Sequence, residues 1–251
     1  MRNVPVSEFD HQPFDVLPIG TDYPPDHLLA RHEHRRAQLL YGASGVMLVE
    51  TDDGSWTVPT DRAVLIPPGV PHEVRMLDVS TWSLYVEPDA VPWWPTRCTV
   101  VEVGPLLREV LRAATALDVP YDDGGRDGAL VRLALHELQR VAPIPLSVSL
   151  PPRGVLRDLC RAYLAEPDVH VTNADWARAA AVSERTLDRH FRAATGVGPA
   201  SWRVRARLLS SLPALRRGTV TEVAGRLGYA TPAAFTAAFS RAFGAPPSRF
   251  R

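Results

Sequence analysis

The stretch TVTEVAGRLGYATPAAFTAAFSRAFG, residues Thr219 to Gly244, has the pattern of a helix-turn-helix, and residues Thr172 to Gly196, TNADWARAAAVSERTLDRHFRAATG, repeat it. Each copy opens with a threonine that is followed three residues later by a carboxylate, Asp175 or Glu222. A threonine hydroxyl in that place accepts a backbone N–H of the first turn, and the carboxylate favours the positive end of the helix. Each copy therefore begins with a capped short helix.

A tight turn follows the first helix in each copy, at Ala181-Val182 and at Gly228-Tyr229. The second helix then carries large apolar residues four positions apart, which places them on one buried face. These residues are Leu187 and Phe191 in one copy and Phe235 and Phe239 in the other. Short helix pairs also occur as plain packing units, but two copies at the end of one chain favour a unit that enters DNA major grooves.

The distribution of charge supports nucleic-acid binding. The chain has 28 basic and 28 acidic residues and is therefore neutral. Residues 1–152 carry 12 Arg against 21 acidic residues, whereas residues 153–251 carry 16 Arg against 7. Positive charge is thus concentrated on the helix-turn-helix region, as neutralisation of phosphates requires. We predict double-stranded DNA as the partner, in preference to a basic surface that is only solvated.

Short runs rich in Val, Leu, Ile and Trp, separated by turns such as Asp53-Gly54, predict a small β-barrel over residues 1–104. Apolar residues at helical spacing then predict two amphipathic helices within residues 105–141. The Pro-rich residues 142–152 are expected to form a linker, followed by an all-α domain over 153–251. The predicted fold class is α+β with two domains.

Targeting and redox signals are simple. No run of about 18 apolar residues occurs, and the N-terminus lacks the pattern of a signal peptide. We expect a cytoplasmic protein without a membrane partner. Cys98 and Cys160 are far apart in the sequence and are predicted to be buried, reduced thiols.

One group of polar residues in the barrel indicates a binding site. His32 and His34 are expected on the same strand face, with Gln38 four residues further on and His72 about one hairpin later. Three imidazoles and an amide oxygen suit a divalent transition metal, namely zinc, nickel, copper or iron. Alternatively, these side chains bond to one another, to water or to an organic effector. Tyr41, Trp56, Trp82 and Tyr85 are candidates for an aromatic wall of the effector site, and Tyr41 and Trp82 are the two predicted to contact the effector.

The C-terminal region resembles the DNA-binding domain of the AraC/XylS family of transcription regulators. The resemblance rests on Gly228-Tyr229, on the phenylalanine pair of the second copy, and on the tail from Gly244 through Pro247 to Phe250-Arg251. It implies that one chain places two recognition helices in successive major grooves, roughly 34 Å apart.

The N-terminal region resembles a cupin sensor domain. HEHRRAQ matches the first cupin motif except that Gln38 replaces the usual Glu, and DRAVLIPPGVPH matches the second except that Asp61 replaces a Gly. Residues 36–74 are similar to a subgroup that often controls a neighbouring efflux transporter gene. The resemblance implies an effector-responsive regulator of an adjacent transporter or catabolic gene, with RNA polymerase as a further partner if it activates. It does not imply an enzyme.

Two alternatives to an organic-effector sensor stay open at this stage. One is a metal-dependent cupin enzyme, and the other is a metal sensor, each with an attached DNA-binding domain. The neutral Gln38 and the lack of an evident acid/base pair in the barrel motifs argue against the enzyme.

The two recognition helices differ in the residues that they offer to DNA. The first offers charged side chains, and Arg185 and Arg189 lie one turn apart, where arginine forks can read guanine. The second offers mainly small side chains, which suit thymine methyl groups and shape. The predicted DNA-binding residues are Arg185, Thr186, Asp188, Arg189 and Arg192 in the first helix, with Thr231, Ala233, Ala234, Thr236, Ala237 and Arg241 in the second.

Residues 199–218 are expected to form a connecting helix about 27 Å long, at 1.5 Å per residue, between the two reading units. Pro213 is expected to kink or end this helix near Leu212. Some of its arginines are expected to contact phosphate.

The apolar faces of the amphipathic helices predict a homodimer. They are larger than one end of a barrel needs, so we expect them to be shared between the barrel and a two-fold partner. The residues concerned are Leu107, Val110, Leu111, Leu133, Leu135 and Leu138.

Overall fold

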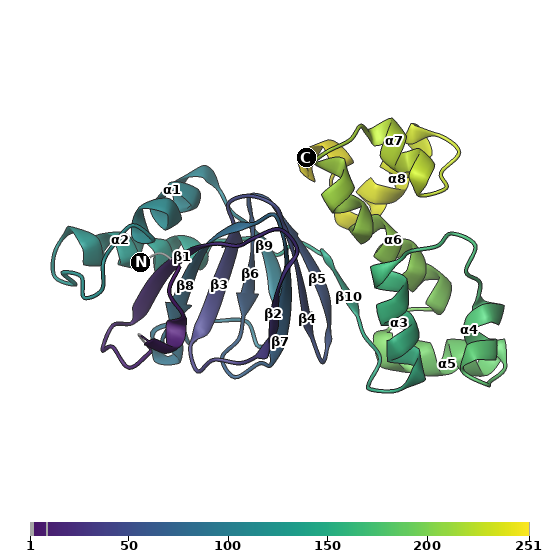
Figure 1. Ribbon diagram of the computed structural model, residues 1–251, viewed down its shortest axis with the longest axis horizontal. Coiled ribbons are helices and arrows are strands. Elements are labelled where there is room, and N and C mark those ends of the chain that lie inside the picture. Colours follow the sequence, from purple (N-terminus) through teal and green to yellow (C-terminus); the bar gives the residue numbers. More distant parts are fainter. Residues whose placement is uncertain (1–2, 9, 251) are drawn as a thin grey trace. The chain divides into compact units, whose positions relative to one another are not determined.

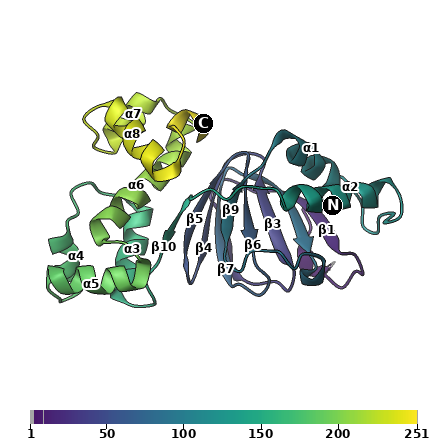
Figure 2. The ribbon, with the colours of Figure 1, turned by 180° about the vertical axis from the view of Figure 1, so that it is seen from behind.

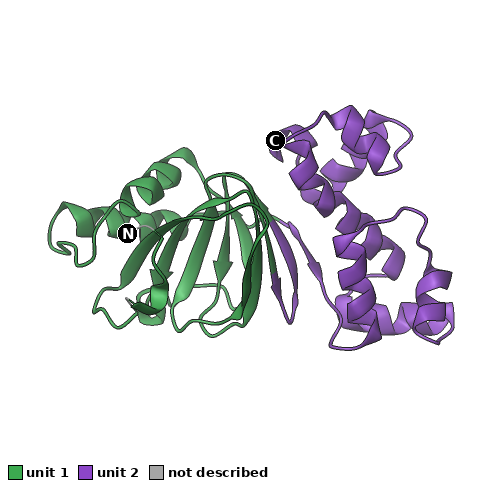
Figure 3. Ribbon diagram, viewed as in Figure 1, with its two compact units in different colours: residues 1–49, 58–144 green, residues 50–57, 145–251 purple. Residues whose placement is uncertain are grey.

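The computed structural model describes residues 3–8 and 10–250. The chain divides into two compact units, which are coloured separately in Figure 3. The first contains residues 1–49 and 58–144 as far as they are described, and the second contains residues 50–57 and 145–250. A short hairpin from the N-terminal part of the sequence is therefore a member of the C-terminal unit.

The N-terminal region is built on two five-stranded sheets, as predicted for a cupin-like fold. The first sheet has the strand order β1-β8-β3-β6-β9 and the second the order β10-β5-β4-β7-β2. The strands are β1 (Val16–Asp22), β2 (His27–His32), β3 (Ala37–Gly42), β4 (Val46–Thr51), β5 (Gly54–Pro59), β6 (Arg62–Ile66), β7 (His72–Leu77), β8 (Ser80–Val86), β9 (Thr99–Glu102) and β10 (Ser147–Ser149). Two 3₁₀ turns, η1 (Val6–Glu8) and η2 (Pro88–Ala90), accompany them.

Two helices, α1 (Pro105–Ala114) and α2 (Arg126–Leu138), lie beside the first sheet in both Figure 1 and Figure 2. Apolar residues recur on one face of each helix, and this face packs on the odd-numbered residues of β3, such as Leu39 and Tyr41. The result is one hydrophobic core between the sheet and the helices, as the 3.6-residue and two-residue periods require.

The segment expected to be the interdomain linker, residues 142–152, contains a short strand. Its central residues form β10, which pairs antiparallel with β5 through Ser147 opposite Trp56 and Ser149 opposite Gly54. The sequence did not indicate this strand because its partner lies about ninety positions away.

The C-terminal unit contains two helix-turn-helix motifs at the two ends of α6 (Figure 1). The first is α4 (Asn173–Ala179) and α5 (Glu184–Thr195), preceded by α3 (Val155–Ala165). The second is α7 (Val220–Arg226) and α8 (Pro232–Phe243), followed by the 3₁₀ turn η3 (Pro247–Phe250). The capping boxes expected at Thr172 and Thr219 are both formed.

Helix α6 (Pro199–Leu215) continues past Pro213, so of the two predicted outcomes, a kink or an end near Leu212, the end does not occur. Proline lacks the N–H that would bond to the carbonyl of Leu209, so the last turn continues with this helical hydrogen bond missing. The hydroxyls of Ser210 and Ser211 also donate to backbone carbonyls three residues earlier, at 2.8 and 2.5 Å.

Both cysteines are buried thiols, as predicted. Burial raises the pKa of the Cys160 thiol, which keeps it protonated and unreactive at neutral pH. No helix among the described residues is long and apolar enough to cross a membrane.

The turn of each helix-turn-helix passes through a left-handed residue, Ala181 (φ 54°) in the first and Gly228 (φ 73°) in the second. The following amide closes each turn, from Val182 to Ala177 and from Tyr229 to Ala224, at 3.0 Å in both. The two copies therefore share one backbone conformation, and alanine is strained in it because of its Cβ.

We predict that Ala181→Gly raises the free energy of unfolding by about 0.5–1 kcal/mol, since relief of left-handed strain exceeds the added freedom of the unfolded chain. Gly228→Ala is the matched reverse change and should lower it by about 1–2 kcal/mol. Its new Cβ would also meet Val169 Cγ2 at 3.1 Å. Urea unfolding of the full chain measures both, and an Ala181→Gly variant no more stable than the parent would contradict the account.

Candidate nucleic-acid interface and effector site

Helix α5 separates a buried face from an exposed basic face. Leu187 and Phe191 are fully buried, and the Phe191 ring packs against Trp202 with centroids 5.9 Å apart. Arg185 and Arg189 are exposed one turn apart on the other side. A buried anchor that holds two exposed guanidinium groups on the opposite face is the arrangement needed to reach base edges in a groove.

Asp188 and Thr186 have local partners within the first motif. Asp188 Oδ2 accepts from Arg192 Nε at 2.8 Å, and this pairing raises the pKa of Arg192. Asp188 therefore orients Arg192, one of the roles considered for it from the sequence. The Thr186 amide and hydroxyl are engaged by Ser183, the N-cap residue of α5, at 3.2 and 3.0 Å. Thr186 thus contributes to the cap that fixes the start of the reading helix.

Helix α8 presents a small and largely uncharged surface. Phe235, Phe239 and Phe243 are its buried residues, and Thr231 caps its N-terminus by accepting the Ala234 amide at 3.1 Å. The remaining predicted DNA residues are exposed or half-buried: Ala233, Ala234, Thr236, Ala237 and Arg241. Only Arg241, in the last turn, has the length to form hydrogen bonds at a distance. The exposed side chains of this helix therefore suit contact with the shape of a groove better than hydrogen bonding to base edges.

The arginines of α6 turn inward. Arg203 is only 6% exposed, lies over the Trp176 ring at 4.8 Å and donates to Asn173 Oδ1 at 2.9 Å. Arg207 lies near the Tyr163 hydroxyl, and Arg205 bonds to three backbone carbonyls. The expectation that some of these arginines contact phosphate does not fit Arg203, Arg205 and Arg207, because each guanidinium bonds to a partner within the unit. Arg203 Nη1 and Arg207 Nε are buried there without a hydrogen-bond partner among the described residues.

Three imidazoles come together at the end of β2 and the start of β7. The ring centroids of His32 and His72 are 4.4 Å apart, and that of His34 is 5.1 Å from His72. His34 follows the end of β2 and does not share a strand with His32, but the loop still brings the rings together. Each Nδ1 lies 2.6–2.8 Å from a backbone carbonyl, at Ala30, Arg36 and Val70 respectively.

Gln38 links the histidines to Tyr85, an aromatic residue on the neighbouring strand β8. The Tyr85 hydroxyl lies 2.9 Å from the Gln38 amide, whose other end lies 3.0 Å from His34 Nε2. Burial lowers the pKa of both His34 and His72, the latter to about 4, so both rings are neutral at pH 7. Gln38 Nε2 donates to the Tyr85 hydroxyl, and Gln38 Oε1 faces His34 Nε2, so this one amide connects both side chains.

Tyr41 and Trp82 do not belong to this group, contrary to the sequence prediction. The two rings stack on each other with centroids 5.3 Å apart and pack with the core under α1 and α2. Positions 38 and 41 of one strand differ by an odd number, so their side chains point to opposite faces of the sheet. Tyr85, another of the predicted aromatic candidates, lies opposite Gln38 in the pairing of β3 with β8 and does belong to the group.

The apolar faces of α1 and α2 are mostly covered within one chain. Four of the six residues expected to be shared with a partner are fully buried, namely Leu107, Val110, Leu111 and Leu138. Leu135 is partly buried against the same core. Leu133 remains 38% exposed, and Leu106 of α1 is 54% exposed. The apolar surface left for a partner is therefore small and centres on these two leucines.

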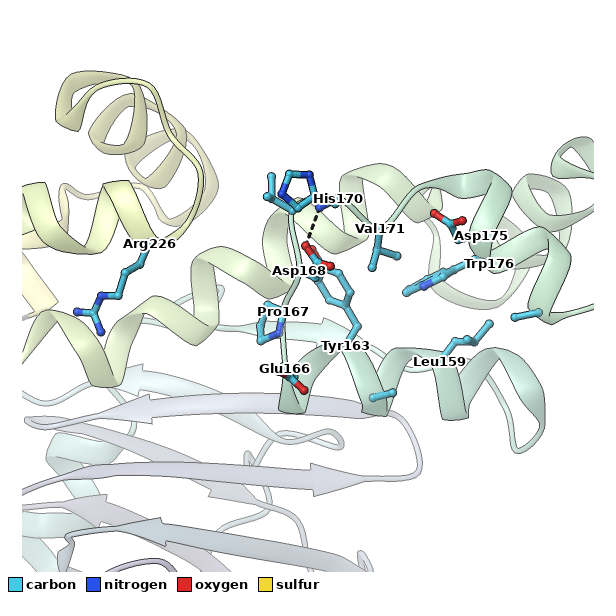
Figure 4. A pocket seen from close by; sticks show the side chains of 13 residues that line it. Leu159, Tyr163, Glu166, Pro167, Asp168, His170, Val171, Asp175, Trp176 and Arg226 are labelled. Atoms are coloured by element: carbon cyan, nitrogen blue, oxygen red, sulfur yellow. Dashed lines mark hydrogen bonds between the residues drawn. The ribbon is translucent and has the colours of Figure 1, made fainter.

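A pocket of about 880 Å³ lies in the C-terminal unit, between α3, the loop to α4, and α4 itself, with Arg226 of α7 at its edge (Figure 4). Two of its three carboxylates have local partners. Asp168 accepts the His170 amide at 2.8 Å, and Asp175 belongs to the capping box of Thr172. None of the predicted effector residues lines it.

Comparisons with known proteins agree with this architecture. Residues 15–143 match the family model described as an AraC-like ligand binding domain, and residues 176–251 match a helix-turn-helix domain. The HTH-type transcriptional regulator NimR of Escherichia coli (strain K12) is 28% identical over 221 residues, which cover 87% of this chain and 81% of NimR. A putative AraC-like transcription regulator of Streptomyces lividans is 39% identical over 82 residues, 32% of this chain and 27% of its own.

Solved structures include the AraC-like transcriptional activator CuxR, which is 18% identical. The match covers 78% of this chain and 77% of that one, with a TM-score of 0.42.

We predict that base specificity resides mainly in α5. Arg189→Ala should weaken binding by about 1–3 kcal/mol at one preferred base position, since the loss of a forked contact to guanine is of that size. Ala233→Ser in α8 is the control and should change little. Titrations of the full chain with base-substituted duplexes measure this, and discrimination that followed α8 instead would contradict it.

Proposed function

Because the chain belongs to the AraC family of transcription regulators, we propose that it reads two successive major grooves of double-stranded DNA and releases or engages them in response to an effector. Like its relatives, the chain is a transcription regulator and not an enzyme. We further propose an adjacent transporter or catabolic gene as its target, with RNA polymerase as a partner if it activates. The cytoplasmic location expected from the sequence follows from this role.

The observation that carries the two-groove proposal is the position of the two motifs on α6. This helix has 17 residues, which is about 25 Å at 1.5 Å per residue, and each end is buried by one motif. A separation of roughly 34 Å between successive grooves exceeds this length, so the proposal requires that the two recognition helices reach the DNA beyond the ends of α6. The exposed Arg185 and Arg189 supply the base-reading chemistry of one of them.

DNA selection followed by footprinting tests this proposal. The full chain is used to select duplexes from a random pool, and the selected duplex is cleaved in its presence. Two protected segments on one face, about 10–10.5 base pairs apart from centre to centre, are expected. A single protected segment would contradict reading by both motifs.

We propose the group of His32, His34, Gln38 and His72, with Tyr85, as the effector site. The buried His34 and His72 rings are neutral, and the group offers lone pairs and amide donors, which suit a small polar molecule. A backbone carbonyl lies beside each Nδ1 and leaves Nε2 as the acceptor, an orientation also typical of metal ligands. In His34 this nitrogen already faces Gln38. Bound zinc, nickel, copper or iron is therefore the alternative effector.

One observation favours the organic effector over the metal. Among residues 3–8 and 10–250, no group of three or more His, Cys, Asp or Glu side chains has the arrangement of a metal centre. Elemental analysis of protein purified without a His tag separates the two cases. A stoichiometric divalent metal would make metal the effector, and its absence after incubation with zinc chloride would support the organic molecule.

We predict that His72→Ala abolishes the effector response while DNA binding is kept, because sensing and reading use different residues. A reporter driven by the adjacent promoter measures the response, and titration with the selected duplex measures binding. His136→Ala, an exposed histidine of α2, is the control. A full response in a folded His72→Ala protein would remove this site from the proposal.

We also propose a homodimer formed around Leu106 and Leu133, the exposed leucines of α1 and α2. Sedimentation at micromolar concentration should show a dimer, and Leu133→Glu should shift it to monomer because a buried unpaired charge disfavours association. Glu137→Gln on the same helix is the control. A parent chain that stays monomeric with and without DNA would overturn this assignment.

A further inference from the structure

Strand β10 lies at one edge of its sheet, so only one of its two edges is paired by β5. The paired edge uses Leu146, whose carbonyl accepts the Thr57 amide at 3.0 Å, and Leu150, whose amide donates to Asp53 at 3.1 Å. Successive carbonyls of a strand point in opposite directions, so those of Ser147 and Ser149 face the unpaired edge. Unpaired backbone groups at an edge need other partners when they are covered.

Helix α6 supplies these partners from two side chains three residues apart. The indole N–H of Trp202 donates to the Ser149 carbonyl at 2.7 Å, and Arg205 Nε donates to the Ser147 carbonyl at 2.8 Å. Arg205 also donates from Nη2 to the Pro145 carbonyl. Residues three apart share one helix face, so β10 is attached along a single side of α6.

The same guanidinium reaches the end of the second recognition helix. Arg205 Nη1 donates to the carbonyl of Ala242 at 3.0 Å, and the guanidinium lies over the Phe243 ring at 5.3 Å. The last carbonyls of a helix have no partner within it, and a cation there also complements the helix dipole. One side chain of α6 therefore fixes both β10 and the C-terminal end of α8.

We propose that Arg205 is a positioning residue for DNA reading, which sets where α8 stands relative to α6 and hence which spacing between half-sites the protein accepts. The inference rests on the proposed reading of two grooves. Burial lowers the pKa of Arg205, in keeping with an inward-facing role.

Arg205 differs in this respect from arginines that are placed to contact phosphate. At least three of its five donors are used inside the unit, each on a backbone carbonyl. Arg216, the C-cap residue of the same helix, is exposed. Loss of a phosphate contact weakens binding to all duplexes and lowers the salt dependence by about one ion, whereas loss of a positioning contact changes the preferred geometry.

The test compares the full-length parent with Arg205→Met, which keeps the apolar stem and removes the guanidinium, and with Arg216→Met as the matched control. The probes are the selected duplex and two versions with one base pair added or removed between the half-sites. One base pair rotates a half-site by about 34°, so the parent should bind the altered duplexes about tenfold or more weakly. Arg205→Met should reduce that penalty to about threefold or less, with the slope of log affinity against log salt unchanged.

Three results would overturn the inference. They are a parent-like spacing penalty in a folded Arg205→Met protein, an equal loss of affinity on all three duplexes, and a salt slope lowered by about one. If Arg205→Met does not fold, Arg205→Lys, which keeps the charge but not the fork, takes its place, and the same spacing ratio decides. A parent without any spacing preference would overturn both this inference and the two-groove proposal.

Discussion

The packing of Trp202 is the contact on which the DNA-binding unit depends. Its side chain is 1% exposed, with ring centroids 5.8 Å from Trp176 of α4 and 5.9 Å from Phe191 of α5. The ring of Tyr163 in α3 lies 6.3 Å from the Trp202 ring, and the Trp202 indole N–H donates to the carbonyl of Ser149 in β10. One residue of α6 thus orients three helices and a strand, and a buried aromatic of this size contributes about 3–5 kcal/mol.

The two motifs share a backbone but differ in chemistry, and this difference suggests separate tasks. Both begin with a capping box and turn through one left-handed residue. The first then exposes Arg185 and Arg189, which can distinguish bases, whereas the second exposes mainly alanines. In this account α5 supplies sequence specificity, and α8 supplies affinity that depends on being held at the right distance. The positions of both along α6 then matter as much as their side chains.

Local features could be predicted from the sequence, and features that depend on distant partners could not. The capping boxes at Thr172 and Thr219 and the core pair Leu187/Phe191 follow from spacing within one turn of helix. Strand β10 and the inward direction of Arg205 depend on contacts with residues far along the chain. The histidines were found by their motif, but Tyr85 was separated from Tyr41 and Trp82 only by the register of β3 with β8.

Measurement of half-site use by a single chain tests the central claim most directly. The full-length protein is titrated with the selected duplex and with two versions in which one half-site or the other is scrambled, and the number of chains per duplex is measured by sedimentation. The account predicts that scrambling either half-site weakens binding and that one chain spans each pair of adjacent grooves. Unchanged affinity after scrambling the half-site of α8, or two chains bound to one such pair, would contradict it.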